Sequence, residues 1–91
     1  NILSSSTITT MWTPSTANSG YGKGWIVDSS YRGHNGAMTG TIAFLVRRND
    51  AFSFAFTVNT RPANDSFAFQ LKGIMDSIVT SVGTWPAYDL F

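Results

Sequence analysis

Residues 31–46 read Tyr-Arg-Gly-His-Asn-Gly-Ala-Met-Thr-Gly-Thr-Ile-Ala-Phe-Leu-Val, and this stretch decides how the chain folds. A polar run with three glycines contains the only histidine, His34, and leads directly into residues 42–46, which are apolar at every position. An uninterrupted apolar run of this length is typical of a strand covered on both faces. The sequence therefore predicts a polar segment over residues 29–36 followed by a strand over residues 37–48.

Two further strands are predicted on either side of this one. Residues 24–30 contain Trp, Ile and Val after a glycine-rich connection, and residues 52–60 alternate large and small side chains. Between the second and third strands, Asn49 and Asp50 predict a two-residue hairpin turn, because both residue types tolerate positive φ. The last two strands should therefore form an antiparallel pair.

Helical patterns lie at both ends of the chain. Residues 1–13 predict a short helix with an N-cap among Ser4, Ser5 and Ser6, ended by Pro14. A longer helix should begin after Asn64 or Asp65 as N-cap and end before Gly83. Its apolar stripe steps by three or four residues, as an amphipathic helix requires: Phe67, Leu71, Ile74, Ile78 and Val82.

These elements predict an α+β fold in a single small domain over residues 1–91. We expect a three-stranded antiparallel sheet with the C-terminal helix and the short N-terminal helix packed on it. The apolar residues of the tail, residues 84–91, should also find a surface to pack against.

The composition excludes several classes of partner. The net charge is +1, with one adjacent basic pair beside Asn49 and Asp50, which is no footprint for nucleic acid. No apolar run approaches the roughly 20 residues of a membrane span. Without cysteine there is no disulfide framework or thiolate zinc site, and no carboxylate stands at metal-ligand spacing from His34. We expect no metal and no cofactor.

Charged residues make up only 12% of the chain, about half the usual share. A surface so poor in charge is expected to face another polypeptide in part. That polypeptide is either a partner chain or a remainder of the same protein.

Two interpretations of His34-Asn35-Gly36 are open from these residues alone. Asn-Gly between two strand patterns is a strong hairpin signal, and His34 would then be an exposed neighbour of the turn. Alternatively, the stretch starts a strand whose polar end lines a site.

The order of motifs along the chain resembles the C-terminal portion of the penicillin-recognising serine hydrolases, the superfamily of class C β-lactamases, D-alanyl-D-alanine carboxypeptidases and related esterases. Residues 2–14 resemble a short helix ending in Met-Leu-Thr-Pro, and residues 21–25 resemble Tyr-Gly-Leu-Gly-Trp. Residues 33–40 are similar to Gly-His-Thr-Gly-Ala-Thr-Gly-Gly. Residues 54–59 resemble the next strand, which ends in Asn, and residues 65–82 resemble the C-terminal helix.

This resemblance implies that His34, Asn35, Gly36 and Ala37 form one wall of an active site. His34 would stand at the basic position, Gly36 would leave room for substrate, and the Ala37 N–H would be one of two oxyanion-hole donors. Asn35 departs from the usual Thr or Ser, which puts carboxylate binding in doubt. The resemblance also implies a periplasmic or extracellular location.

The nucleophile of that superfamily is missing, so the catalytic set in this chain is not complete. Its serine lies in Ser-x-x-Lys, but Lys23 and Lys72 are preceded at that spacing by Gly20 and Phe69. The Tyr-x-Asn or Ser-x-Asn element is absent as well. We therefore expect a β-lactamase-like C-terminal segment that is inactive alone and depends on an N-terminal catalytic region or another chain. One alternative is a non-catalytic interaction module that folds alone or as a homodimer. The other is a decayed fragment without a function of its own.

Overall fold

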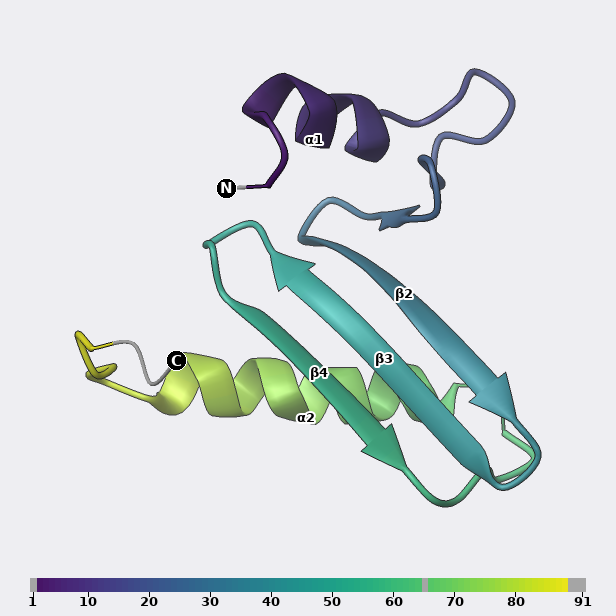
Figure 1. The fold of residues 1–91 in the computed structure, drawn as a ribbon. Helices are drawn as coiled ribbons and strands as arrows, with labels where there is room; N and C mark the ends of the chain where they lie inside the picture. The colour runs from purple at the N-terminus through teal and green to yellow at the C-terminus, as the bar shows by residue number, and fades with distance from the viewer. Residues whose placement is uncertain (1, 65, 89–91) are drawn as a thin grey trace.

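The computed structural model describes residues 2–64 and 66–88 of the chain. They form an α+β fold with an antiparallel sheet of four strands in the order β1-β2-β3-β4, together with two helices (Figure 1). The elements are α1 (Ser5–Trp12), β1 (Ile26–Val27), β2 (Tyr31–Met38), β3 (Thr41–Arg48), β4 (Ser53–Val58) and α2 (Phe67–Ser81). The α+β class is confirmed, but the predicted count of three strands is wrong.

The additional strand is the polar segment of the opening stretch. β2 and β3 pair along their whole length, from Tyr31 opposite Arg48 to Met38 opposite Thr41. The chain reverses at Thr39 and Gly40, where Gly40 has φ 73°, a conformation that glycine adopts without steric cost. The continuous strand predicted over residues 37–48 is therefore interrupted, and the alternative that placed a hairpin at Asn35-Gly36 is wrong. β1 is also shorter than the strand predicted over residues 24–30.

The hairpin between β3 and β4 has one residue more than predicted. The Arg48 N–H donates to the Phe52 carbonyl at 2.8 Å, and the Ala51 N–H donates to the Arg48 carbonyl at 3.3 Å. Ala51 has φ 75°, whereas neither Asn49 nor Asp50 takes positive φ. The predicted two-residue turn is therefore wrong, and its left-handed position is occupied by a residue with a Cβ atom.

Replacing Ala51 with glycine should stabilise the protein. A left-handed conformation costs an L-residue roughly 1–2 kcal/mol, and the greater freedom of glycine in the unfolded chain removes part of the gain. We expect Ala51→Gly to raise the free energy of unfolding by about 0.5–1 kcal/mol, measured by urea denaturation. Ala55→Gly, in the interior of β4, is the control and should lower it by about the same amount. Equal effects of the two variants would contradict this account.

Both predicted helices exist. Ser4 is the N-cap of α1 and its side chain accepts a hydrogen bond from the Thr7 N–H at 3.2 Å. The hydroxyls of Thr9 and Thr10 donate to the carbonyls four residues earlier, which lets these β-branched residues sit in the helix. The N-cap of α2 is Ser66 rather than Asn64, and Asp65 lies outside the described residues.

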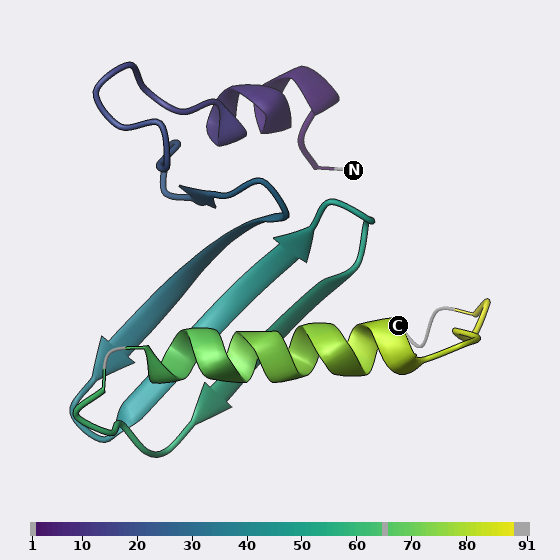
Figure 2. The ribbon, with the colours of Figure 1, turned by 180° about the vertical axis from the view of Figure 1, so that it is seen from behind.

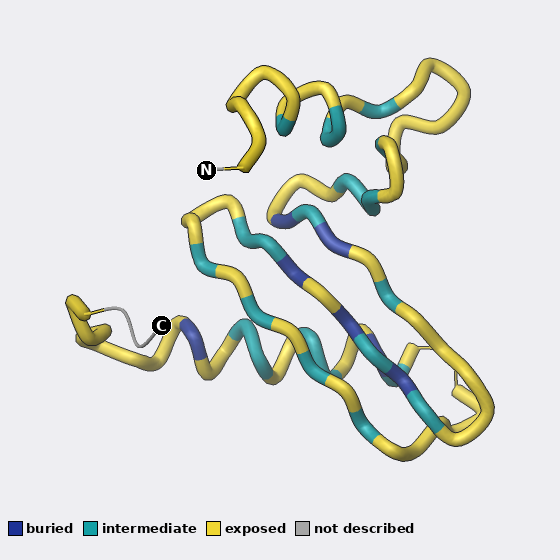
Figure 3. The backbone as a smooth tube through the Cα atoms, viewed as in Figure 1, coloured by how far each residue is buried: buried dark blue, intermediate teal, exposed yellow. Residues whose placement is uncertain are grey.

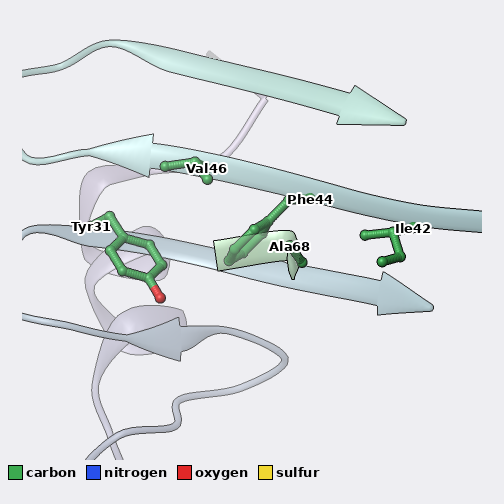
Figure 4. Close-up of a cluster of buried hydrophobic side chains, with 5 residues drawn as sticks. All are labelled: Tyr31, Ile42, Phe44, Val46 and Ala68. Atoms are coloured by element: carbon green, nitrogen blue, oxygen red, sulfur yellow. The ribbon is translucent and has the colours of Figure 1, made fainter. Parts of the chain in front are cut away.

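The core lies between one face of the sheet and α2. Its buried members come from β2, β3 and α2 and are shown in Figure 4: Tyr31, Ile42, Phe44, Val46 and Ala68. The predicted stripe of α2 is only partly correct, because Ile74 and Ile78 are about half exposed, whereas Ala68, outside the stripe, is buried. The predicted packing of the tail holds for Trp85, which meets Phe52 with ring centroids 5.0 Å apart, but not for Tyr88, which is exposed. Leu90 and Phe91 lie outside the described residues.

The opposite face of the sheet carries no helix in the described part of the chain (Figures 1 and 2). α1 lies beyond the ends of the strands instead of on a face, so the predicted packing of this helix on the sheet is wrong. Leu45 in the central strand is 47% exposed, and the burial pattern of Figure 3 alternates along β3. The prediction that residues 42–46 are covered on both faces is therefore also wrong.

Candidate functional site

The four residues predicted to line a site are consecutive in β2, and their side chains divide between its two faces. Tyr31 and Gly33 are buried on the side of α2, and Asn35 and Ala37 share their side of the strand. Those two residues line a pocket of about 360 Å³ whose other walls come from β3, from α2 and from the segment before α2. His34 and Gly36 instead lie on the side of the sheet without a helix. The structure therefore directs the His34 side chain to one face of the sheet and the side chains of Asn35 and Ala37 to the other.

The backbone of this segment lies on an unpaired edge. β1 pairs with β2 only at Arg32 and Gly33, and no other described strand continues along that edge. The Asp28 N–H donates to the Tyr31 carbonyl at 3.0 Å, so Tyr31 directs its backbone groups to the β1 side. Because successive residues alternate between the two edges of a strand, the N–H groups of Asn35 and Ala37 point to that same open edge. The predicted oxyanion donor is therefore accessible.

Tyr21 joins His34 at this edge. The Tyr21 hydroxyl lies 2.9 Å from Nε2 of His34, and the two rings meet edge to face with centroids 5.9 Å apart. Nδ1 of His34 lies 2.7 Å from the Asn35 carbonyl oxygen. A carbonyl oxygen can only accept, so Nδ1 carries the proton, Nε2 accepts, and the Tyr21 O–H donates. His34 is thus held in one orientation and one tautomer.

The sequence patterns did not connect Tyr21 with His34. The loop before β1 folds back on itself, with the Val27 N–H donating to the Gly20 carbonyl at 2.8 Å. Gly22 lets the same loop lie against the end of α1, because a Cβ there would lie 2.6 Å from the Met11 carbonyl oxygen. The alternating glycines were a signal of close approach, but their spacing does not reveal which residue Tyr21 contacts.

Removing the Tyr21 hydroxyl should change the tautomer of His34. We expect ¹⁵N NMR of the neutral imidazole to show mainly the Nδ1–H form. Tyr21→Phe removes the donor to Nε2, so the Nε2–H form should rise to a comparable population. The chain has one histidine, so the signals need no assignment. Tyr88→Phe is the matched control, and a spectrum that Tyr21→Phe leaves unchanged would disprove the contact.

A network of ion pairs lies at the C-terminal end of β3 and connects the β3–β4 hairpin to α2. Arg48 bonds to Asp50 at 2.6 Å and to Asp76 at 3.1 Å, and Lys72 bonds to Asp76 at 2.5 Å. Hydrogen bonding to Arg48 lowers the pKa of Asp50, and the reciprocal bond raises the pKa of Arg48. These groups neutralise each other, which is typical of a structural role.

Two other pKa shifts have local causes. Hydrogen bonds from the backbone and hydroxyl of Ser30 lower the pKa of Asp28, and burial raises the pKa of Tyr31. Within residues 2–64 and 66–88, no three potential ligands gather around a possible metal position. In the same part of the chain, no helix has the length and apolar character needed to cross a membrane.

Comparison with protein-family models, with curated proteins and with solved structures finds no significant match.

Proposed function

We propose that this chain is the C-terminal sheet-and-helix segment of a β-lactamase-related serine hydrolase and is inactive by itself. The observation that carries the proposal is the open edge of β2, where the Ala37 N–H is unpaired by any described strand and His34 is fixed by Tyr21. A fixed N–H at a strand edge suits an oxyanion that develops during acyl transfer. The ordered motifs in the sequence supply the choice of superfamily.

The expected inactivity follows from the missing nucleophile. No Ser-x-x-Lys occurs in the sequence, and removing the nucleophile alone removes nearly all the rate enhancement of a serine hydrolase. We expect no saturable turnover of a chromogenic cephalosporin or of p-nitrophenyl acetate by the chain alone. Saturable hydrolysis that persists in His34→Ala would contradict the proposal.

A positive test uses the coding DNA upstream of the codon for Asn1. The proposal expects an in-frame Ser-x-x-Lys there, and the longer product should be acylated by a fluorescent penicillin or hydrolyse the aryl ester. In that product, Ala37→Pro removes the edge N–H and should slow acylation by about 10²–10³-fold. Thr57→Ala, at an exposed position of β4, is the control and should leave acylation unchanged. A stop codon upstream without Ser-x-x-Lys would refute the assignment.

A second function, that of a non-catalytic interaction module, is supported by the uncovered face of the sheet. Leu45 is 47% exposed and Met38 is 70% exposed, and exposed apolar surface of this kind is common at protein interfaces. A homodimer through this face is the form that needs no other chain. Sedimentation of the chain at about 0.5 mM tests the homodimer, because a dimer with a micromolar Kd is mostly assembled at that concentration. A monomer at that concentration counts against the homodimer.

A further inference from the structure

Two arginine side chains lie directly opposite each other in the sheet. Arg32 of β2 is in register with Arg47 of β3, and both lie on the side without a helix. Like charges at directly opposite positions of an antiparallel pair are destabilising. Together with Trp12 at the end of α1, the two arginines line a pocket of about 300 Å³. Within the described residues, neither arginine forms an ion pair that would offset the repulsion.

Each guanidinium is held in place through a single nitrogen. Nη1 of Arg32 donates to the carbonyls of Asp28 and Tyr31 at 2.6 and 2.9 Å. Nη1 of Arg47 donates to the Ala51 carbonyl and to the Ser53 hydroxyl. Since a guanidinium has five N–H donors, Nη2 of both side chains and Nε of Arg47 carry no hydrogen bond among the described residues. The groups are therefore oriented before any ligand arrives.

One guanidinium donor is buried. Nε of Arg32 is inaccessible to solvent and has no hydrogen-bond partner in the described part of the protein. A buried donor without an acceptor costs roughly 1–3 kcal/mol, and more when it belongs to a charged group. A ligand in the pocket would therefore contact Arg32 through Nη2, and the unpaired Nε leaves the charge of this guanidinium only partly satisfied by the protein.

The charges around the pocket determine what the ligand should be. Its lining contains no carboxylate, and its third arginine, Arg48, is already neutralised by Asp50 and Asp76. Arg32 and Arg47 thus present two positive charges without a counter-charge among the described residues. Planar guanidinium groups bind phosphate and carboxylate oxygens in pairs. A phosphoryl group carries about −1.5 to −2 at pH 7, which matches both arginines, whereas a carboxylate matches only one.

We propose that Arg32 and Arg47, with Trp12 beside them, form a binding site for a dianionic phosphoryl group. This inference does not depend on the hydrolase assignment. Inorganic phosphate and a phosphate monoester share the chemistry that these donors recognise, and the aromatic wall at Trp12 gives the monoester an additional contact.

The test follows the arginine Nε–H signals in ¹H–¹⁵N NMR spectra of the whole chain, assigned with single Arg→Lys variants. Inorganic phosphate should shift the signals of Arg32 and Arg47 along one saturable curve and leave Arg61 unmoved. Acetate should bind at least about tenfold more weakly, since one charge-assisted hydrogen bond is worth about 1.5–3 kcal/mol. Phenyl phosphate binding more tightly than inorganic phosphate would assign the site to monoesters, and equal binding would assign it to the free ion.

Variants provide the control. Arg47→Gln should weaken phosphate binding at least about tenfold, whereas Arg61→Gln, with the same loss of charge, should not. Arg47→Lys keeps the charge but loses the planar group, and it should also weaken binding if Arg47→Gln fails to fold. Shifts that do not saturate, equal affinity for acetate, or unchanged affinity in both Arg47 variants would overturn the proposal.

Discussion

Phe44→Ala should nearly abolish the folded state. Phe44 is 1% exposed in the central strand, and its ring meets those of Tyr31, Phe56 and Phe69 edge to face at 5.4–6.1 Å. Truncating a buried phenylalanine costs about 3–5 kcal/mol, because apolar contacts are lost and a cavity remains. Domains of this size have little stability in reserve, with about 5 kcal/mol at the low end of the usual range. Thermal unfolding followed by circular dichroism should show a fall in Tm of well over 10 °C, or no transition.

The adjacent residue provides the matched control. Leu45 follows Phe44 in β3 but faces the side without a helix, and it is 47% exposed. Leu45→Ala should therefore cost about 1 kcal/mol or less. If the two variants lost similar stability, the side of the sheet without a helix would be covered in solution. Sedimentation of the Leu45→Ala protein would then distinguish a dimer interface from an intramolecular contact.

Gly33→Ala should produce the second large loss of folding stability. Gly33 is buried in β2, where an added Cβ would lie 2.6 Å from the Leu45 carbonyl oxygen and 3.2 Å from the Tyr31 ring. The first neighbour is backbone in a paired strand, so it moves only if the β2–β3 ladder distorts. Overpacking of this kind costs about 1–3 kcal/mol, and the backbone contact places Gly33→Ala at the upper end of that range. Urea denaturation should show a lower midpoint with an unchanged slope.

Gly36→Ala tests the same strand without the clash. A Cβ at Gly36 meets nothing within 4 Å, and Gly36 does not take positive φ. The free energy of unfolding of the Gly36→Ala variant should therefore stay within about 0.5 kcal/mol of that of the unchanged protein. It could also rise slightly, because alanine has less conformational freedom than glycine in the unfolded chain. A loss at Gly36 equal to that at Gly33 would show that glycine is required for backbone conformation at both positions.

Local patterns were sufficient to predict several elements. The period of the apolar residues in 67–82 and the serines before residue 7 predicted both helices, because capping and amphipathicity depend on neighbours along the chain. The alternation over residues 52–60 predicted β4 in the same way. The predicted pairing of β3 with β4 is also confirmed, and only the size of their turn is wrong, since Ala51 takes the left-handed position.

Other features depended on contacts between distant residues. Polarity suggested a loop over residues 29–36, but β2 forms there because Tyr31 packs on Phe44 while Arg32 and His34 face away from α2. The apolar run over residues 42–46 suggested cover on both faces, and the structure leaves Leu45 half exposed. Hydrophobicity indicates that a residue can be buried, not that another element lies over it.

The candidate site divides in the same way between sequence and structure. The sequence by itself determined the residue types from His34 to Ala37 and the absence of Ser-x-x-Lys. It also determined that Arg32 and Arg47 carry like charges, wherever the fold places them. Only the tertiary structure decided that the Tyr21 hydroxyl reaches His34, that the Ala37 edge has no partner strand among the described residues, and that Arg32 faces Arg47. The reason is physical: residue chemistry is local to the chain, whereas hydrogen bonds across a folded loop and the register of two strands depend on where the chain turns.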